Sequence, residues 1–189
     1  MKRLAIFASG NGSNAQAIAE YFSESSDARI VLILTNRKDA FVIERAKALN
    51  IPVRVFNRTD FYETEVITQM MIDEQIDLIV LAGFLWLLPT SLIHAFPNRI
   101  INIHPALLPN YGGKGMYGGK VHSAVIAAGE KESGISIHFV DEHYDQGQVI
   151  FQARCTIEAD DTPDTLAAKI HALEYAHFAA TIHQVLKTL

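Results

Sequence analysis

The sequence predicts an α/β fold: a single-domain, mostly parallel, doubly wound sheet of about seven strands, with an antiparallel C-terminal addition and a long C-terminal helix. Short apolar runs alternate with helical patterns of about 10–15 residues, which is typical of right-handed βαβ units. One run, residues 76–82, is almost continuously apolar, as expected of a central parallel strand covered on both faces. A glycine-rich segment, ASGNGSNAQAI at residues 8–18, directly follows the first apolar run and leads into a helical pattern.

The remaining elements follow from periodicity and from capping residues. Strands are expected at residues 4–8, 29–34, 53–56, 76–82, 99–105, 134–140 and 148–157. The last two flank the polar segment DEHYDQG, so we expect an antiparallel hairpin there. Helices are expected around residues 15–22, 41–49 and 60–71, just after Pro89, at 121–128 and from Pro163 onward. Asp60 and Glu63 are the expected capping pair of the third helix, and Thr162 is the expected N-cap of the last.

The composition indicates a chain that acts on small molecules. Its formal net charge is -5, from 21 acidic and 16 basic residues without a basic run, so nothing indicates binding to nucleic acid or to an anionic membrane. No stretch approaches the roughly 20 apolar residues of a membrane-spanning helix. Cys155 is the only cysteine, which excludes an intrachain disulfide and a multi-cysteine zinc site. We expect one domain over residues 1–189, in the cytoplasm, as a monomer or a homodimer.

The glycine-rich turn has three interpretations. Its GNGSNA motif, residues 10–15, satisfies the G-x-G-x-x-A fingerprint of dinucleotide sites. An NAD site also needs an acidic residue after the second strand, whereas this chain has TNR at residues 35–37, which leaves only NADP. Ser13 and Asn14 can add side-chain hydrogen bonds to the N–H groups of a helix N-terminus, which favours a compact phosphate monoester. A plain tight turn is the third interpretation.

A second motif, RIINIHPALLP at residues 99–109, ends an expected strand with polar residues. Asn102 and His104 alternate along the strand, so both project from one face at the carboxyl end, where open α/β sheets bind ligands. Asp145 lies in the DEHYDQG loop; if that loop folds over the same edge, its carboxylate raises the pKa of His104. Each residue alone also fits a structural role.

Together, an amide, an imidazole and a carboxylate without an adjacent serine or cysteine suit acyl transfer to an amine that is its own nucleophile. Asn102 and protonated His104 would stabilise the oxyanion, and Asp145 would assist the proton transfer. These roles remain hypotheses when the residues are taken alone.

Five segments occur in an order and spacing that resembles one known family: SGNGSN, VLAGF, INIHPALLP, the strand with Ser136 and His138, and DQG at Asp145. On these segments the chain resembles the phosphoribosylglycinamide formyltransferase family, within the wider superfamily of formyl-tetrahydrofolate transferases and hydrolases. The resemblance runs from Leu4 to the last helix. It implies transfer of the formyl group of 10-formyltetrahydrofolate to the amine of 5′-phosphoribosylglycinamide in de novo purine (IMP) biosynthesis, without a metal.

The resemblance also implies roles for individual residues. The substrate phosphate would bind at Gly12, Ser13 and Asn14, and Glu174 in the last helix would bind the same substrate. Asn102, His104 and Asp145 would be the catalytic residues. The folate would be bound by Leu85, Trp86, Leu87, Leu88, Asn102, Val140 and Asp141.

Three positions depart from the pattern of well-known members. Trp86 stands where the folate-binding loop often has arginine, and its indole offers stacking area instead. Tyr175 follows the expected substrate-binding glutamate where a histidine is usual. An arginine assigned to folate in some members falls at Asp60, with Arg58 nearby, so that contact has no assigned residue.

Other features carry weaker expectations. The segment YGGKGMYGG, residues 111–119, contains five glycines and fits either a lid that excludes water or a flexible connection. His122 is expected to be structural, and the histidines of the last helix lack the i, i+4 spacing of a metal motif, so no metal is expected. The alternative functions are an NADP-linked oxidoreductase, a related formyl-tetrahydrofolate hydrolase and a phospho-ligand-binding module without activity.

Overall fold

The apolar runs of the sequence pair into one seven-stranded sheet, and the computed structural model describes the whole chain, residues 1–189. In chain order the strands are β1 (Lys2–Phe7), β2 (Ala28–Thr35), β3 (Val53–Val55), β4 (Leu78–Leu81), β5 (Ile100–His104), β6 (Glu132–Phe139) and β7 (Val149–Thr156). Across the sheet they lie in the order β3-β2-β1-β4-β5-β6-β7. Neighbours among β1 to β5 are parallel, whereas β6 is antiparallel to both β5 and β7. The predicted mostly parallel sheet with an antiparallel addition is confirmed.

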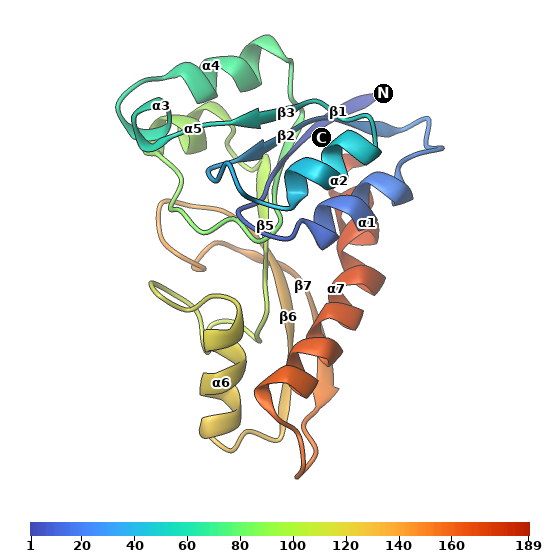
Figure 1. The fold of residues 1–189 in the computed structure, drawn as a ribbon, viewed down its shortest axis with the longest axis vertical. Helices are drawn as coiled ribbons and strands as arrows, with labels where there is room; N and C mark the ends of the chain where they lie inside the picture. Colours follow the sequence, from blue (N-terminus) through green and yellow to red (C-terminus); the bar gives the residue numbers. More distant parts are fainter.

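Seven helices connect and cover the strands (Figure 1). They are α1 (Ser13–Tyr21), α2 (Val42–Ala48), α3 (Arg58–Tyr62), α4 (Val66–Asp73), α5 (Thr90–Ala95), α6 (Gly119–Ala127) and α7 (Pro163–Leu186). As the sequence predicts, Thr162 caps α7: its hydroxyl accepts the N–H of Thr165 at 3.3 Å, and Pro163 occupies the first helical position. None of these helices has the length and apolar character needed to cross a membrane.

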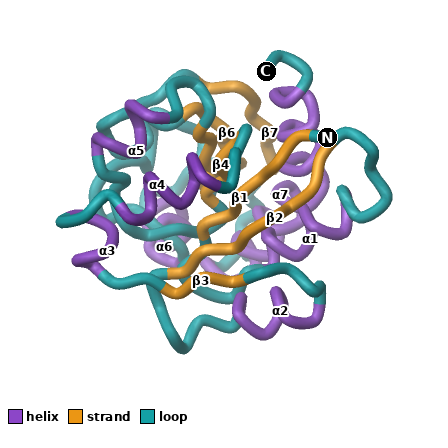
Figure 2. Tube along the Cα trace, turned by 90° about the horizontal axis from the view of Figure 1, so that it is seen from above, coloured by secondary structure: helices purple, strands orange, loops and turns teal.

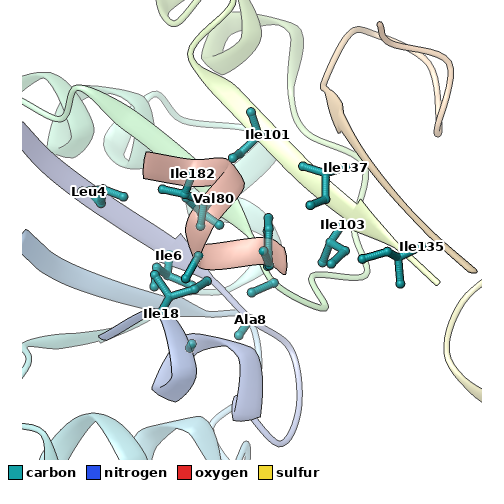
Figure 3. Packing of buried hydrophobic residues seen from close by; sticks show 14 of the residues in the cluster. Leu4, Ile6, Ala8, Ile18, Val80, Ile101, Ile103, Ile135, Ile137 and Ile182 are labelled. Carbon is teal, nitrogen blue, oxygen red and sulfur yellow. The ribbon is translucent and has the colours of Figure 1, made fainter. Parts of the chain in front are cut away.

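Alternate residues of the strands face two separate cores, one on each side of the sheet. In β1, Leu4 and Ile6 join the larger core with α1 and α7, whereas Ala5 and Phe7 join the smaller core with α3, α4 and α5 (Figure 2). Figure 3 shows the larger core, in which Ile182 of α7 lies among apolar side chains of the strands. The sheet is therefore covered on both faces, as a doubly wound fold requires.

The strand order reverses between β1 and β4, and this reversal positions the site. From β1 the chain builds β2 and β3 on one side of the sheet, and then returns to add β4 and β5 on the other. A crevice forms beyond the carboxyl ends of the strands at such a point, because the two sets of connections diverge there. The glycine-rich turn after β1 and the polar end of β5 both lie at this edge.

The segment after β3 corrects one prediction. Two helices, α3 and α4, take the place of the single expected helix, and the expected cap of Asp60 with Glu63 is wrong. Asn57 is the N-cap: its side chain accepts the N–H of Asp60 at 2.9 Å, while the Asp60 carboxylate accepts the N–H of Asn57 at 3.2 Å. The N-cap is therefore Asn57, three residues before the expected Asp60, and Asp60 is the N3 residue of the capping box.

Candidate active site

The turn between β1 and α1 presents the N-terminus of a helix to the crevice. Gly12 is the N-cap residue with a φ of 76°, and a Cβ added to it would lie 2.4 Å from Val42 Cγ2. Arg45 of α2 holds the neighbouring residue in place, since its guanidinium donates to the main-chain and side-chain oxygens of Asn11 at 2.9 and 2.7 Å. No side chain caps the helix, so the first N–H groups of α1 have no side-chain partner, an arrangement that suits an anion.

Asn14 and Glu174 meet beside this helix terminus, although 160 residues separate them in the sequence. The Asn14 amide donates to Glu174 Oε2 at 2.9 Å, and the Oδ1 atom of Asn14 is buried without a partner. Glu174 is only 7% exposed, and this burial raises the pKa of its carboxyl against the opposing effect of the Asn14 hydrogen bond. The pair offers a bound molecule one unsatisfied acceptor and one carboxyl group.

Three predicted catalytic side chains also converge at the crevice. Asn102 and His104 lie at the carboxyl end of β5, and Asp145 comes from the loop between β6 and β7. The Asp145 Oδ2 atom lies 3.5 Å from His104 Nδ1, and its Oδ1 atom accepts from the Asn102 amide at 3.5 Å. Gly147 fixes the end of that loop, because a Cβ there would lie 1.8 Å from the carbonyl oxygen of Phe139.

The electrostatics of this trio differ from the sequence expectation. Burial lowers the pKa of His104 below its ordinary value, and the opposing effects of Asp145 and of the hydrogen bond to Tyr111 do not compensate. Asp145 does raise the pKa of His104, as expected, but burial lowers it by more, so the expected net rise is wrong. Burial also opposes ionisation of Asp145, yet the His138 and His104 rings beside it hold its pKa below the ordinary value. The free protein therefore combines a charged carboxylate with a histidine that favours its neutral form.

His138 belongs to the same cluster, although sequence patterns alone do not mark it as a site residue. It is paired with Asn102 across the β5–β6 ladder, and the Asn102 amide lies 3.1 Å from its Nε2 atom. The Nδ1 atom lies 2.8 Å from the carbonyl oxygen of Phe139, which can only accept, so Nδ1 carries a proton. Nε2 also lies 3.6 Å from Asp145 Oδ1, so the ring contacts both the amide and the carboxylate of the site.

One cavity of about 690 Å³ connects these groups. Its volume lies in the usual range for small-molecule sites. All the residues expected to act in catalysis or to bind the phosphoribosyl substrate line this cavity. Of the residues expected to bind the folate, Leu85, Trp86, Leu87, Leu88, Asn102 and Val140 also line it. Asp141 is the exception: it borders a separate, smaller hollow and accepts the N–H of His143 at 2.8 Å.

Trp86 lies in an aromatic cluster at the expected folate end. Its ring centroid is 5.8 Å from that of Phe61 and 5.9 Å from that of Tyr62. The guanidinium of Arg58 lies 5.1 Å from the Trp86 ring centroid and 5.3 Å from that of Tyr62, a cation–π arrangement. Arg58 of α3 thus stacks on a residue that lines the cavity without lining it itself, and Asp60 belongs to the cap of α3.

His122, which the sequence marks as structural, also lines the cavity. It is 4% exposed, and its Nδ1 atom is buried without a partner. Burial lowers its pKa, as do the nearby rings of His171 and His104, so the neutral ring is favoured. No group of three or more His, Cys, Asp or Glu side chains lies close enough to hold a metal ion.

Comparisons with known proteins agree with this geometry. The family model described as "Formyl transferase" matches residues 2–182. A curated phosphoribosylglycinamide formyltransferase of Bacillus subtilis is 38% identical over 98% of this chain and 95% of its own length. The chloroplastic enzyme of the same name from Arabidopsis thaliana is 44% identical over 89% of this chain, which spans 60% of that protein's length.

Solved structures give the same relationship in three dimensions. The phosphoribosylglycinamide formyltransferase of Streptococcus pneumoniae superimposes with a TM-score of 0.86 at 37% identity, covering 98% of this chain and 99% of that one. The Bacillus halodurans protein gives a TM-score of 0.87 at 38% identity, covering 98% and 95%. The chain therefore belongs to the formyl transferase family, in its phosphoribosylglycinamide formyltransferase branch.

Proposed function

We propose that this protein transfers the formyl group of 10-formyltetrahydrofolate to the amine of 5′-phosphoribosylglycinamide, a step of de novo purine biosynthesis. One observation carries the proposal: the Asn102, His104 and Asp145 side chains share a cavity with the uncapped N-terminus of α1. The three side chains suit acyl transfer, and the helix N-terminus suits a phosphate. Both line one continuous cavity. Membership of the formyltransferase family supports both assignments.

The phosphoribosyl substrate would bind at the α1 end. Its phosphate would accept hydrogen bonds from the N–H groups of Ser13 and Asn14, with Gly12 allowing close approach, and the helix dipole favours its negative charge. Glu174 would accept hydrogen bonds from the substrate's hydroxyl or amide groups, since it lies beside Asn14 in the same cavity. On this proposal the glycine-rich turn binds a phosphate monoester.

The formyl-folate would bind at the other end. Leu85 to Leu88 and Val140 supply an apolar wall for a flat heterocycle, and Asn102 lines the same cavity. Arg58, held over Trp86, provides a positive charge for the negatively charged tail of a folate. A role for Asp141 in this site remains a prediction that its present position does not support.

The chemistry needs no covalent enzyme intermediate. The substrate amine attacks the formyl carbon, the carbonyl electron pair moves to the oxygen, and the Asn102 amide and the His104 ring stabilise the resulting oxyanion. The Asn102 contact to Asp145 is long at 3.5 Å, so this N–H is free to turn to the formyl oxygen when substrate is present. The attacking amine must lose a proton, and His104, neutral in the free protein, is positioned to take it.

Two measurements test the proposal. Calorimetric titration with 5′-phosphoribosylglycinamide should give saturable binding, whereas titration with NADPH should not. A spectroscopic assay of tetrahydrofolate release should then require both substrates. Tetrahydrofolate release without the amine substrate would indicate a hydrolase instead, and binding without release would indicate a binding module.

An NADP-linked oxidoreductase has little support from the site. Arg37, the residue available to meet the extra phosphate of NADP, forms an exposed ion pair with Asp39 at 2.9 Å. Family membership also favours acyl transfer. A single domain over residues 1–189, a cytoplasmic location and a monomeric or homodimeric state remain predictions.

A further inference from the structure

Both ring nitrogens of His104 have defined neighbours. Nε2 lies 2.8 Å from the main-chain carbonyl oxygen of Tyr111, and Nδ1 lies 3.5 Å from Asp145 Oδ2. A carbonyl oxygen can only accept a hydrogen bond, so Nε2 carries a proton whether the ring is neutral or charged. The proton that the ring gains and loses is therefore the one on Nδ1, on the side of Asp145.

The same short segment also holds Asp145. The N–H of Gly113 donates to Asp145 Oδ2 at 2.9 Å, two residues after the carbonyl that binds His104. The main chain of residues 111–113 thus accepts from the histidine and donates to the carboxylate. Tyr111 is fixed in turn by its hydroxyl, which donates to Glu130 at 2.7 Å.

Packing leaves this segment little freedom. Tyr111 and Asp145 both have a φ of 56°, a left-handed conformation that is uncommon outside glycine. Between the two contacts lies Gly112, where an added Cβ would be 2.6 Å from Leu108 Cδ2 and 3.2 Å from Asp145 Cβ. Any side chain at position 112 must therefore move the segment, Leu108 or Asp145.

We propose that the main chain of residues 111–113 is a positioning device that selects Nδ1 as the reactive nitrogen of His104 and holds Asp145 opposite it. This inference rests on the proposed formyl transfer for its catalytic meaning. As the amine nitrogen bonds to the formyl carbon, the amine proton moves to Nδ1. When the bond from the formyl carbon to the folate nitrogen breaks, that nitrogen takes the proton from Nδ1 and the oxyanion electron pair re-forms the carbonyl.

The ring protonation can be measured without turnover. In ¹⁵N-histidine-labelled protein at about pH 8, above the ordinary histidine pKa, ring correlations should show His104 with the proton on Nε2 and a bare Nδ1. The His104→Gln spectrum identifies the signal by its loss. A proton on Nδ1 of the neutral ring would overturn the proposal, whatever the activity of the protein.

Two glycines of one segment provide a matched pair for kinetics. Gly112→Ala introduces the close contacts, whereas Gly119→Ala adds a methyl group at an ordinary φ with no atom within 4 Å. We expect Gly112→Ala to lower kcat by about 100-fold through displacement of the reacting groups, with KM for both substrates unchanged. Gly119→Ala should retain the wild-type kcat. Equal kcat in the two variants would overturn the proposal.

A double variant separates positioning from folding. Leu108→Ala removes the atom nearest to the added methyl group, so Gly112→Ala with Leu108→Ala should recover part of the lost kcat and the Nε2-protonated signal. If Gly112→Ala fails to fold, the wild-type ring spectrum and the double variant still decide the matter. Absence of formyl transfer in the wild type would refute the proposed function, while the ring spectrum would still test the tautomer.

Discussion

Replacing Asp145 by asparagine removes the charge beside His104 with almost no change of shape. In the structure Asp145 Oδ2 lies 3.5 Å from His104 Nδ1, and the two side chains are only 11% and 4% exposed. Opposite unit charges at this separation attract by about 5 kcal/mol at an effective dielectric constant of about 20. Because each 1.4 kcal/mol or so is tenfold in rate, loss of this stabilisation of the imidazolium should lower kcat on the order of 1000-fold.

Binding of the phosphoribosyl substrate should survive the change, because its phosphate is expected at the N-terminus of α1 and not at Asp145. The experiment measures kcat from tetrahydrofolate release and, separately, the calorimetric Kd for 5′-phosphoribosylglycinamide. Glu142→Gln is the matched control: it removes an exposed carboxylate from the same loop, one that pairs with His94 and does not line the catalytic cavity, and kcat should stay near wild type.

The reasoning is refuted if Asp145→Asn keeps kcat within about tenfold of wild type, since the charge would then contribute little to the barrier. An equal loss in Glu142→Gln would instead assign the effect to the conformation of the loop. A large rise in the Kd for the phosphoribosyl substrate would show that Asp145 acts in binding.

The remaining predictions concern stability. Gly12→Ala should lower the free energy of unfolding by about 2–4 kcal/mol in urea titrations, because position 12 has a left-handed φ and the added Cβ would lie 2.4 Å from Val42. Gly10→Ala has open space around the added Cβ and should leave the free energy of unfolding unchanged, and equal values for the two variants would contradict the steric argument. Thr162→Ala should cost about 1 kcal/mol and lower Tm by about 2–4 °C, and an unchanged Tm would show that the α7 cap contributes nothing. Glu174→Gln should gain stability relative to wild type as the pH rises above the ordinary carboxyl pKa of about 4.5, and it should bind 5′-phosphoribosylglycinamide more weakly. Burial raises the folded pKa of Glu174, so the wild type loses stability over the pH range between its unfolded and folded pKa; parallel pH profiles of the two proteins would contradict this.

Features with a local period were predictable from the sequence. The alternation of Asn102 and His104 with the isoleucines beside them places both polar side chains on one face of β5, and the structure keeps them there. The glycine-rich turn was equally readable, because a left-handed N-cap between a strand and a helix needs a residue such as Gly12. These predictions depend only on neighbours within a few residues.

Features that depend on register or burial were not predictable. His138 meets Asn102 only because β6 pairs antiparallel with β5 in one particular register, and nothing local to either segment sets that register. The net pKa direction of His104 depends on how deeply packing buries the ring, whereas the sequence indicates only that a carboxylate, Asp145, is available. The contacts from residues 111–113 come from main-chain atoms, which carry no sequence signature beyond the glycine at position 112.

A histidine that is neutral before the reaction suits the proposed chemistry better than one that is already charged. An α-amino-like nucleophile has a pKa of about 8 and is active only as the free amine, and it must discard a proton once the new bond forms. Neutral His104 can accept that proton at Nδ1, and the charge then appears 3.5 Å from Asp145 at the moment when the oxyanion needs it. The two effects on His104 therefore act in sequence. Burial lowers its pKa and so keeps the neutral base available before the reaction. The Asp145 carboxylate then stabilises the imidazolium after proton transfer.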